Sequence, residues 1–166
     1  MFELKPLSQG AIPSALEKAH RYRLLNEPGE AESICRDVLE IDPDHQDALV
    51  ILLLALTDQF EEHLGKAGDE ARQVLARIRD DYSRTYHTGI ACERRAKAHL
   101  KRGGPRSHHQ AYDWFEQALE HYDRAAALRP PGNDDAILRW NTCVRILRAR
   151  PELGPDLEVE VRQWLE

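Results

Sequence analysis

Residues 13–43 read PSALEKAHRYRLLNEPGEAESICRDVLEIDP, and this stretch decides the expected fold. Pro13 and Ser14 are typical of a helix start, since proline is tolerated in the first turn and serine can cap free amides. Asn-Glu-Pro-Gly at 26–29 separates this helix from a second amphipathic one, which ends at Pro43 because proline cannot continue the hydrogen-bond ladder. Apolar residues of the first helix recur at the three-and-four spacing of one helical face: Ala15, Leu16, Ala19, Tyr22 and Leu25. The stretch therefore predicts a helical hairpin.

The same arrangement recurs along the rest of the chain. Residues 47–82 predict a second hairpin with a break at 65–68, and residues 83–130 predict a third that turns at Gly103-Gly104. Helices over 133–166 are expected to cap the end, the last of them from residue 156 with Trp164 and Leu165. No segment alternates apolar and polar residues as a half-buried strand does. We expect one all-α domain over residues 1–166, built as an α-solenoid of antiparallel helical hairpins.

Small and bulky residues follow one spacing in all three hairpins. The first hairpin carries Ala19-x-x-Tyr22, then Ala31-x-x-x-Cys35-x-x-Val38-Leu39 and Pro43. The second carries Leu53-x-x-Leu56 with Ala71-x-x-x-Leu75-x-x-Ile78, and the third carries Gly89-x-x-Cys92 with Ala118-x-x-x-Tyr122-x-x-Ala125 and Pro130. This pattern resembles the tetratricopeptide repeat, in which small residues let two helices approach and bulky ones fill the gaps between hairpins. The resemblance implies about three divergent repeats, with generic α-solenoids and plain helical bundles as the alternatives.

The resemblance also implies a function. In tetratricopeptide-like proteins the first helix of each hairpin lines a concave groove that holds a peptide or helix of a partner protein. Carried onto this sequence, the predicted partner-binding residues are Glu17, His20, Arg23, Val50, Ile51, Leu54, Asp58, Tyr86, His87, Ile90, Arg94 and Asn141, and Glu93 and Arg139 face the same side. The lysine and asparagine clamp by which some family members hold a carboxyl-terminal peptide is not expected, because its places in the first hairpin hold Leu16 and His20. We expect a noncatalytic adaptor.

The apolar run at 49–56 leaves two interpretations open. A helix that is apolar all round must be covered on every side, so the run is either a docking stripe or core buried by a strongly curved superhelix. If the helices pair across a twofold axis, the stripe is instead a homodimer interface, and the chain is a homo-oligomerisation module.

Charge is divided unevenly along the chain. The net charge is −6, but residues 72–106 hold ten Lys or Arg against three Asp or Glu. Such a segment can steer an acidic partner, or it can pair with acidic neighbours inside the molecule. A helical repeat that binds RNA or DNA through this segment is a further alternative, which the acidity of the remaining chain disfavours.

Other function classes have little support in the sequence. The three cysteines, Cys35, Cys92 and Cys143, form no C-x-x-C pair, and the eight histidines include no His-x-x-x-His spacing, so no disulfide framework, metal or cofactor is expected. No nucleophile motif or phosphate-binding loop is present, which predicts a protein that is not an enzyme. The chain shows neither a secretory leader nor an apolar run of the roughly 20 residues that cross a bilayer, and a cytoplasmic location without a membrane partner is expected.

Overall fold

The computed structural model describes residues 2–155 and is built of helices. In this range the chain forms no strand, which confirms the all-α prediction for the described residues. The expected helix from residue 156, with Trp164 and Leu165, lies outside them. The elements are a short 3-10 helix, Gln9–Ala11, and the α-helices α1 (Ile12–Leu24), α2 (Pro28–Ile41), α3 (Gln46–Asp58), α4 (Phe60–Leu75), α5 (Asp81–Arg102), α6 (Ser107–Leu128) and α7 (Asp135–Ala149).

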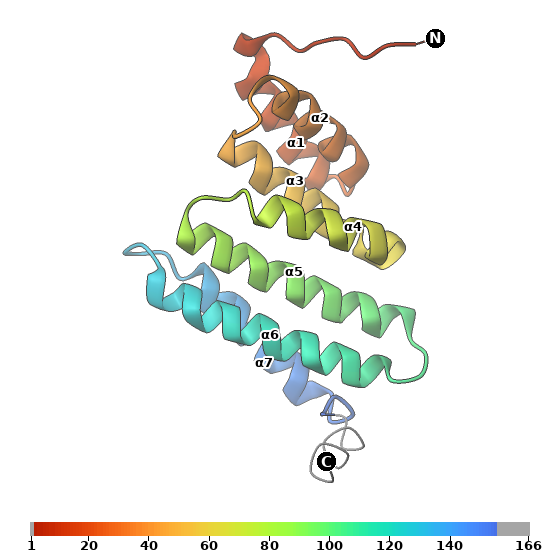
Figure 1. Cartoon of the computed structure of the whole chain (residues 1–166). Coiled ribbons are helices and arrows are strands. Elements are labelled where there is room, and N and C mark those ends of the chain that lie inside the picture. The colour runs from red at the N-terminus through yellow and green to blue at the C-terminus, as the bar shows by residue number, and fades with distance from the viewer. Residues whose placement is uncertain (1, 156–166) are drawn as a thin grey trace, which may run out of the picture.

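Each helix packs against the next one along the chain, so the molecule extends from its N-terminal to its C-terminal end as a series of helices (Figure 1). α5 and α6 are the longest, with 22 residues each, and lie side by side. α1 also contacts α3, and α3 contacts α5. These three alternate helices therefore form one layer, on which most of the predicted groove residues lie.

The residues of the repeated pattern are buried at equivalent places. In the first hairpin Ala19, Ala31, Cys35 and Val38 are 0% exposed, and in the third Ala118, Tyr122 and Ala125 are 0% exposed. Among the members of the pattern, Tyr22, Leu39 and Leu75 remain partly exposed, and the closing prolines Pro43 and Pro130 are exposed. Burial on this scale supplies most of the free energy that holds neighbouring helices together. The interior divides into a cluster formed mainly by α1–α4 and a second formed mainly by α5–α7.

The turn of the second hairpin lies at Gln59 rather than at 65–68. α4 begins at Phe60 and runs through Gly65 and Gly68, with a kink at His63, where φ is −131° and ψ is 41°. Gln59 stabilises the turn, since its side-chain amide donates to the Ala55 carbonyl oxygen (3.2 Å) and to Glu32 Oε2 (2.7 Å). Phe60, the next residue, is 2% exposed. Tertiary contacts therefore set this boundary, and the two glycines are tolerated inside the helix.

The boundary between the second and third hairpins also differs from the expected one at 82 and 83. α4 ends at Leu75, and α5 begins at Asp81. Asp80 caps α5, because its Oδ2 accepts a hydrogen bond of 2.7 Å from the backbone N–H of Ser83. Ile78, in the connecting turn, is buried at 2% exposure.

Candidate functional site

A pocket of about 430 Å³ opens on the layer formed by α1, α3 and α5. It brings together residues that lie more than 60 positions apart in the sequence. The lining residues are Pro13, Leu16, Glu17 and His20 of α1, Asp47, Val50 and Ile51 of α3, and Ser83 and His87 of α5. Five of the predicted partner-binding residues, Glu17, His20, Val50, Ile51 and His87, are therefore neighbours around one cavity.

The pocket has an apolar floor and an acidic rim. Leu16 is 8% exposed and Ile51 is 1% exposed, while Val50 is partly exposed. Ile51 was expected to contact a partner directly, but it is a core residue that borders the cavity. Glu17 and Asp47 are exposed, and neither forms an ion pair or hydrogen bond with another residue of the part of the chain that the structure describes. Both carboxylates are thus available to a ligand.

His87 forms the wall on the α5 side. Its Nδ1 lies 2.7 Å from the carbonyl oxygen of Ser83 and 3.2 Å from the Ser83 Oγ. Burial lowers the pKa of His87 below its ordinary value of 6.5, and the nearby charges of Arg94 and Arg23 lower it further, although the hydrogen bond to Ser83 opposes this shift. The imidazole is therefore neutral at pH 7 and adds no positive charge to the pocket.

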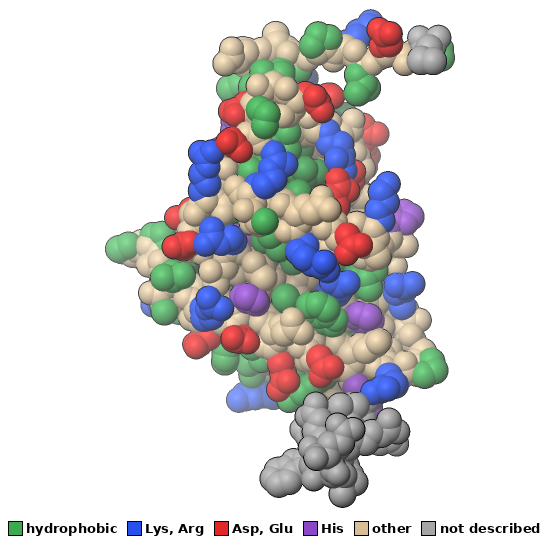
Figure 2. Space-filling view, in the orientation of Figure 1, with side chains coloured by type: hydrophobic (Ala, Val, Ile, Leu, Met, Phe, Trp, Pro, Cys, Tyr) green, Lys and Arg blue, Asp and Glu red, His purple; other side chains and the backbone are tan. Residues whose placement is uncertain are grey.

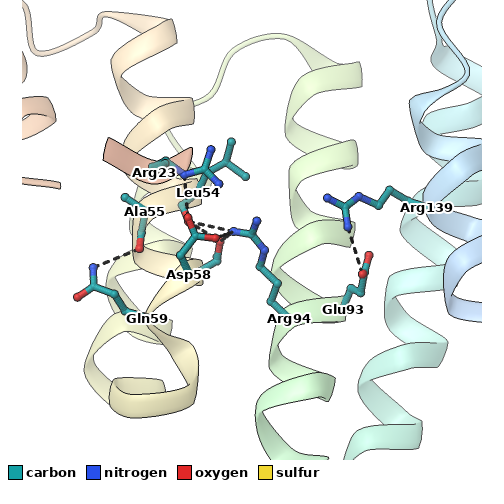
Figure 3. A network of polar contacts seen from close by, with 9 residues as sticks. Arg23, Leu54, Ala55, Asp58, Gln59, Glu93, Arg94 and Arg139 are labelled. Carbon is teal, nitrogen blue, oxygen red and sulfur yellow. Dashed lines mark hydrogen bonds and ion pairs between the residues drawn. The ribbon is translucent and has the colours of Figure 1, made fainter. Parts of the chain in front are cut away.

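Asp58 joins two of the predicted groove residues in an ion-pair network (Figure 3). Its Oδ2 lies 2.8 Å from Arg23 Nε of α1, and its Oδ1 lies 2.7 Å from Arg94 Nη1 of α5. Arg94 Nη1 also donates to the carbonyl oxygen of Leu54 at 2.9 Å. Burial lowers the pKa of Arg94, and the Asp58 carboxylate opposes that shift. The structure brings these three side chains together, but they pair with one another rather than with a partner. Their ion pairs connect α1, α3 and α5.

A second polar cluster surrounds Glu93, which the sequence places on the groove side and the structure buries completely. Tyr122 Oη donates to Glu93 Oε2 at 2.6 Å, and Lys97 Nζ lies 2.5 Å from Oε1. Arg139 Nη1 approaches Oε1 at 3.3 Å (Figure 3). Burial by itself raises the pKa of Glu93, but the hydrogen bonds from Lys97 and Tyr122 outweigh it and lower the pKa. The carboxylate is therefore ionised and connects α5, α6 and α7.

The other predicted groove residues lie away from the pocket. Ile90 is buried at 4% exposure in the second core cluster, so it is a core residue rather than a surface contact, and Leu54 packs against the same cluster. Tyr86 stacks on Tyr82, with ring centroids 5.8 Å apart. Asn141 lies partly buried on α7 and does not line the pocket. Ile90 and Leu54 therefore contribute to the second core cluster and not to the pocket.

The basic segment at 72–106 is largely neutralised by carboxylates of the same chain. Six of its ten basic residues form ion pairs with carboxylates of residues 2–155, which are Arg72–Asp69, Arg79–Asp44, Arg84–Asp81, Arg94–Asp58, Lys97–Glu93 and Lys101–Glu61. This arrangement favours internal pairing over a surface for RNA or DNA, because a polyanion binds through free positive charge.

The cysteines are core residues. Cys35, Cys92 and Cys143 are all buried and unpaired. Burial raises the pKa of the Cys35 thiol to about 12, that of Cys92 to about 11 and that of Cys143 to about 12. All three are therefore protonated near neutral pH, the state in which a thiol is a poor nucleophile.

Comparison with models of protein families, with curated proteins and with solved structures finds no match for this chain. Within residues 2–155, no group of three or more His, Cys, Asp or Glu side chains is placed to hold a metal ion. In the same range no helix combines the length and apolar character needed to cross a membrane. The pocket between α1, α3 and α5 is the feature on which a functional inference rests.

Proposed function

We propose that this chain is a tetratricopeptide-like helical repeat that acts as a noncatalytic adaptor and binds a peptide or helix of a protein partner on the α1, α3 and α5 layer. The observation that carries the proposal is the pocket of about 430 Å³, because its lining residues come from alternate helices and include five that the repeat pattern predicts. The serial packing of the helices and the burial of the pattern residues support the repeat architecture.

The pocket favours a cationic side chain next to an apolar one. Leu16 and Val50 offer apolar contact, and Glu17 and Asp47 offer two carboxylates without a counter-charge from the described residues. The lining contains no Lys or Arg. The sequence suggested an acidic partner from the basic segment at 72–106, but internal ion pairs occupy six of those charges. We therefore assign the pocket a peptide or helix with a Lys or Arg beside an aliphatic residue.

The geometry of Ser83 and His87 supports a binding role over a hydrolytic one. A serine and a histidine in contact can form a nucleophile and its general base. Here, however, Nδ1 lies closer to the Ser83 carbonyl oxygen, at 2.7 Å, than to Oγ, at 3.2 Å. A ring nitrogen so close to a carbonyl oxygen carries the proton and donates it, so it has no lone pair with which to accept the hydroxyl proton.

A peptide selection tests the proposal. Random peptides displayed on phage are selected against the whole chain, and the affinity of the enriched peptides is measured by calorimetry at low and high salt. We expect Lys or Arg next to Leu, Ile or Val in the enriched sequences. The double variant Glu17→Gln/Asp47→Asn is expected to weaken binding about tenfold at low salt and less at high salt, because exposed charges are screened.

The matched control is Glu40→Gln/Asp123→Asn, which removes the same two charges from exposed positions on α2 and α6. It is expected to bind as the unmodified chain does. The proposal fails if no peptide is enriched, if the enriched peptides lack basic residues, or if both double variants weaken binding equally.

A further inference from the structure

A second pocket, of about 240 Å³, lies between α4, α5 and α6. None of its lining residues belongs to the first pocket, so an inference drawn from it is independent of the adaptor proposal. Figure 2 shows the face formed by α4, α5 and α6, where Lys and Arg side chains lie over α4 and α5 and acidic ones gather along α6. Its lining residues include Phe60, Gly68, Leu75, Arg95, Trp114 and His121.

Arg95 is the unusual residue of this pocket. Its guanidinium lies over the Trp114 ring, with Cζ 4.5 Å from the ring centroid, and is partly buried. Gly68 also lies against the guanidinium, since a Cβ there would be 3.4 Å from Nη2, in van der Waals contact. The Nε atom is buried and has no hydrogen-bond partner, and within residues 2–155 Arg95 forms no ion pair with a carboxylate. A cation in this position lacks the counter-charge that normally offsets its desolvation.

Unlike Arg95, the other inward-facing arginines pair with carboxylates. Arg23 and Arg94 each pair with Asp58, and Arg139 pairs with Glu93. Stacking on an indole compensates a guanidinium only in part, because a cation–π contact is weaker than a bidentate pair with a carboxylate. Arg95 is therefore held in place and left with donors for an anion.

The surroundings of Arg95 are electropositive. The pocket lining contains Arg72 and His121 and no Asp or Glu. His121 Nδ1 is buried and, like Arg95 Nε, has no hydrogen-bond partner among the described residues. Burial lowers the pKa of His121, and Arg124 lowers it further, so its ring is a neutral hydrogen-bonding group at pH 7. Of the two other basic groups, Arg72 pairs with Asp69 at 3.5 Å, with both side chains 71% exposed.

We propose that this pocket binds a carboxylate carried on a short aliphatic stem, with the guanidinium of Arg95 pairing with the carboxylate. Trp114, Phe60 and Leu75 supply the apolar wall for the stem. A volume of 240 Å³ corresponds to about eight groups of water size, at roughly 30 Å³ each, and this matches a six-carbon acid. The same chemistry is offered by a free fatty acid of that length and by the carboxyl terminus of a peptide that ends in a leucine.

An NMR titration of the whole chain tests the proposal. The probes are hexanoate and its uncharged analogue hexanamide, followed by the tripeptide Ala-Leu-Leu with a free or an amidated carboxyl end. The readout is the indole N–H resonance of Trp114. We expect a carboxylate probe to shift this resonance with a Kd of about 1 mM or tighter, and the corresponding amide to leave it unchanged. The probe that binds more tightly identifies the source of the carboxylate.

Two variants complete the test. Arg95→Gln is expected to weaken carboxylate binding about tenfold or more. Arg102→Gln removes the same charge from an exposed position at the end of α5 and is expected to leave binding unchanged. The proposal is overturned if neither carboxylate shifts the resonance, if the amides bind equally well, or if Arg102→Gln weakens binding as much as Arg95→Gln. The comparison of acid with amide needs no variant, so a variant that fails to fold does not leave the proposal undecided.

Discussion

Glu93 is a fully buried carboxylate, and its surroundings determine whether it stabilises or destabilises the fold. Removing a carboxylate from water is costly, and the cost is recovered only when donors satisfy its oxygens. Tyr122, Lys97 and Arg139 supply those donors from three helices. Sequence reasoning placed Glu93 and Arg139 on one side of the molecule. It could not foresee their contact, because they lie 46 positions apart and pair only after α5, α6 and α7 have packed.

Replacing Glu93 is expected to destabilise the chain. Glu93→Gln leaves Lys97 and Arg139 without their counter-charge, and we expect a loss of about 2 kcal/mol in the free energy of unfolding at pH 7, measured by urea denaturation. This is below the usual cost of breaking a buried pair because the side chains of Lys97 and Arg139 are 40% and 36% exposed. Glu120→Gln, an exposed change on α6, is the control and is expected to have no effect.

The difference in stability between the unmodified chain and the Glu93→Gln variant depends on pH with a defined sign. The folded pKa of Glu93 is lowered from 4.5, so its contribution is fully present above pH 4.5 and is lost as the pH falls through the folded pKa. The two proteins should therefore converge in stability at acid pH. A difference in the free energy of unfolding that stays constant between about pH 7 and about pH 3 would contradict the account.

At the scale of the element, α5 and α6 pack along each other, and Gly89 of α5 faces Tyr122 of α6. A Cβ at position 89 would lie 2.6 Å from Cε1 of the Tyr122 ring, and that ring is completely buried. Glycine is here a steric requirement of the packing, even though it weakens a helix interior. The repeat pattern names both residues, but it assigns bulky residues to the gaps between hairpins, and Tyr122 instead packs on Gly89 within one hairpin.

Two glycine substitutions test this reading of α5. Gly89→Ala is expected to cost about 2 kcal/mol in the free energy of unfolding, because the buried tyrosine ring has to move. Gly65→Ala in α4 is the matched control, since a Cβ there meets nothing within 4 Å. It is expected to stabilise the chain by about 0.5–1 kcal/mol through helix propensity alone. The free energy of unfolding of both variants is measured by urea denaturation. A Gly89→Ala variant that is more stable than the unmodified chain would refute the steric role of Gly89.

Some helix boundaries could be predicted from the sequence and others could not. The start of α6 at Ser107 and its end at Leu128 follow from the turn residues on either side. The turn at Gln59 has no glycine or proline, so pattern reasoning moved it to Gly65 and Gly68. The cap at Asp80 could have been predicted, because aspartate is a preferred helix N-cap residue. The apolar spacing that continues to Ile78 instead suggested that the preceding helix extends past this point.

At the scale of the whole molecule, Asp58 holds the α1, α3 and α5 layer together. Its carboxylate contacts Arg23 on one side and Arg94 on the other (Figure 3), so a single residue of α3 connects all three helices. The side chains of Arg23, Asp58 and Arg94 are 16%, 22% and 21% exposed, which leaves the network only partly screened by water. The pocket is lined by residues of the same three helices that this network connects.

Removing the Asp58 carboxylate should loosen the layer. Asp58→Asn leaves two partly buried guanidinium groups facing each other, and we expect a loss of about 2 kcal/mol in the free energy of unfolding. Asp113→Asn, which changes an exposed residue of α6, is expected to be neutral within about 0.5 kcal/mol. Equal stability of Asp58→Asn and the unmodified chain would show that the network contributes nothing to the fold.

For the groove, the sequence predicted several of the residues that line the pocket but did not predict which apolar residues are buried. The resemblance to the tetratricopeptide repeat placed Glu17, His20, Val50 and His87 on one face, and these residues line one pocket. The same reasoning could not tell which apolar residues of that face would be covered by neighbouring helices. It therefore included Ile51 and Ile90, which are 1% and 4% exposed in the packed helices.

One measurement tests the central claim most directly: an NMR titration of the whole chain with the tightest peptide from the phage selection, following the backbone amide resonances. The account predicts that the shifted resonances belong to residues around Leu16, Val50 and His87, on α1, α3 and α5. Shifts confined to α2, α4 or α6 would contradict it. So would concentration-dependent shifts at Leu16 and Val50 without peptide, because they would show that a second copy of the chain occupies the pocket.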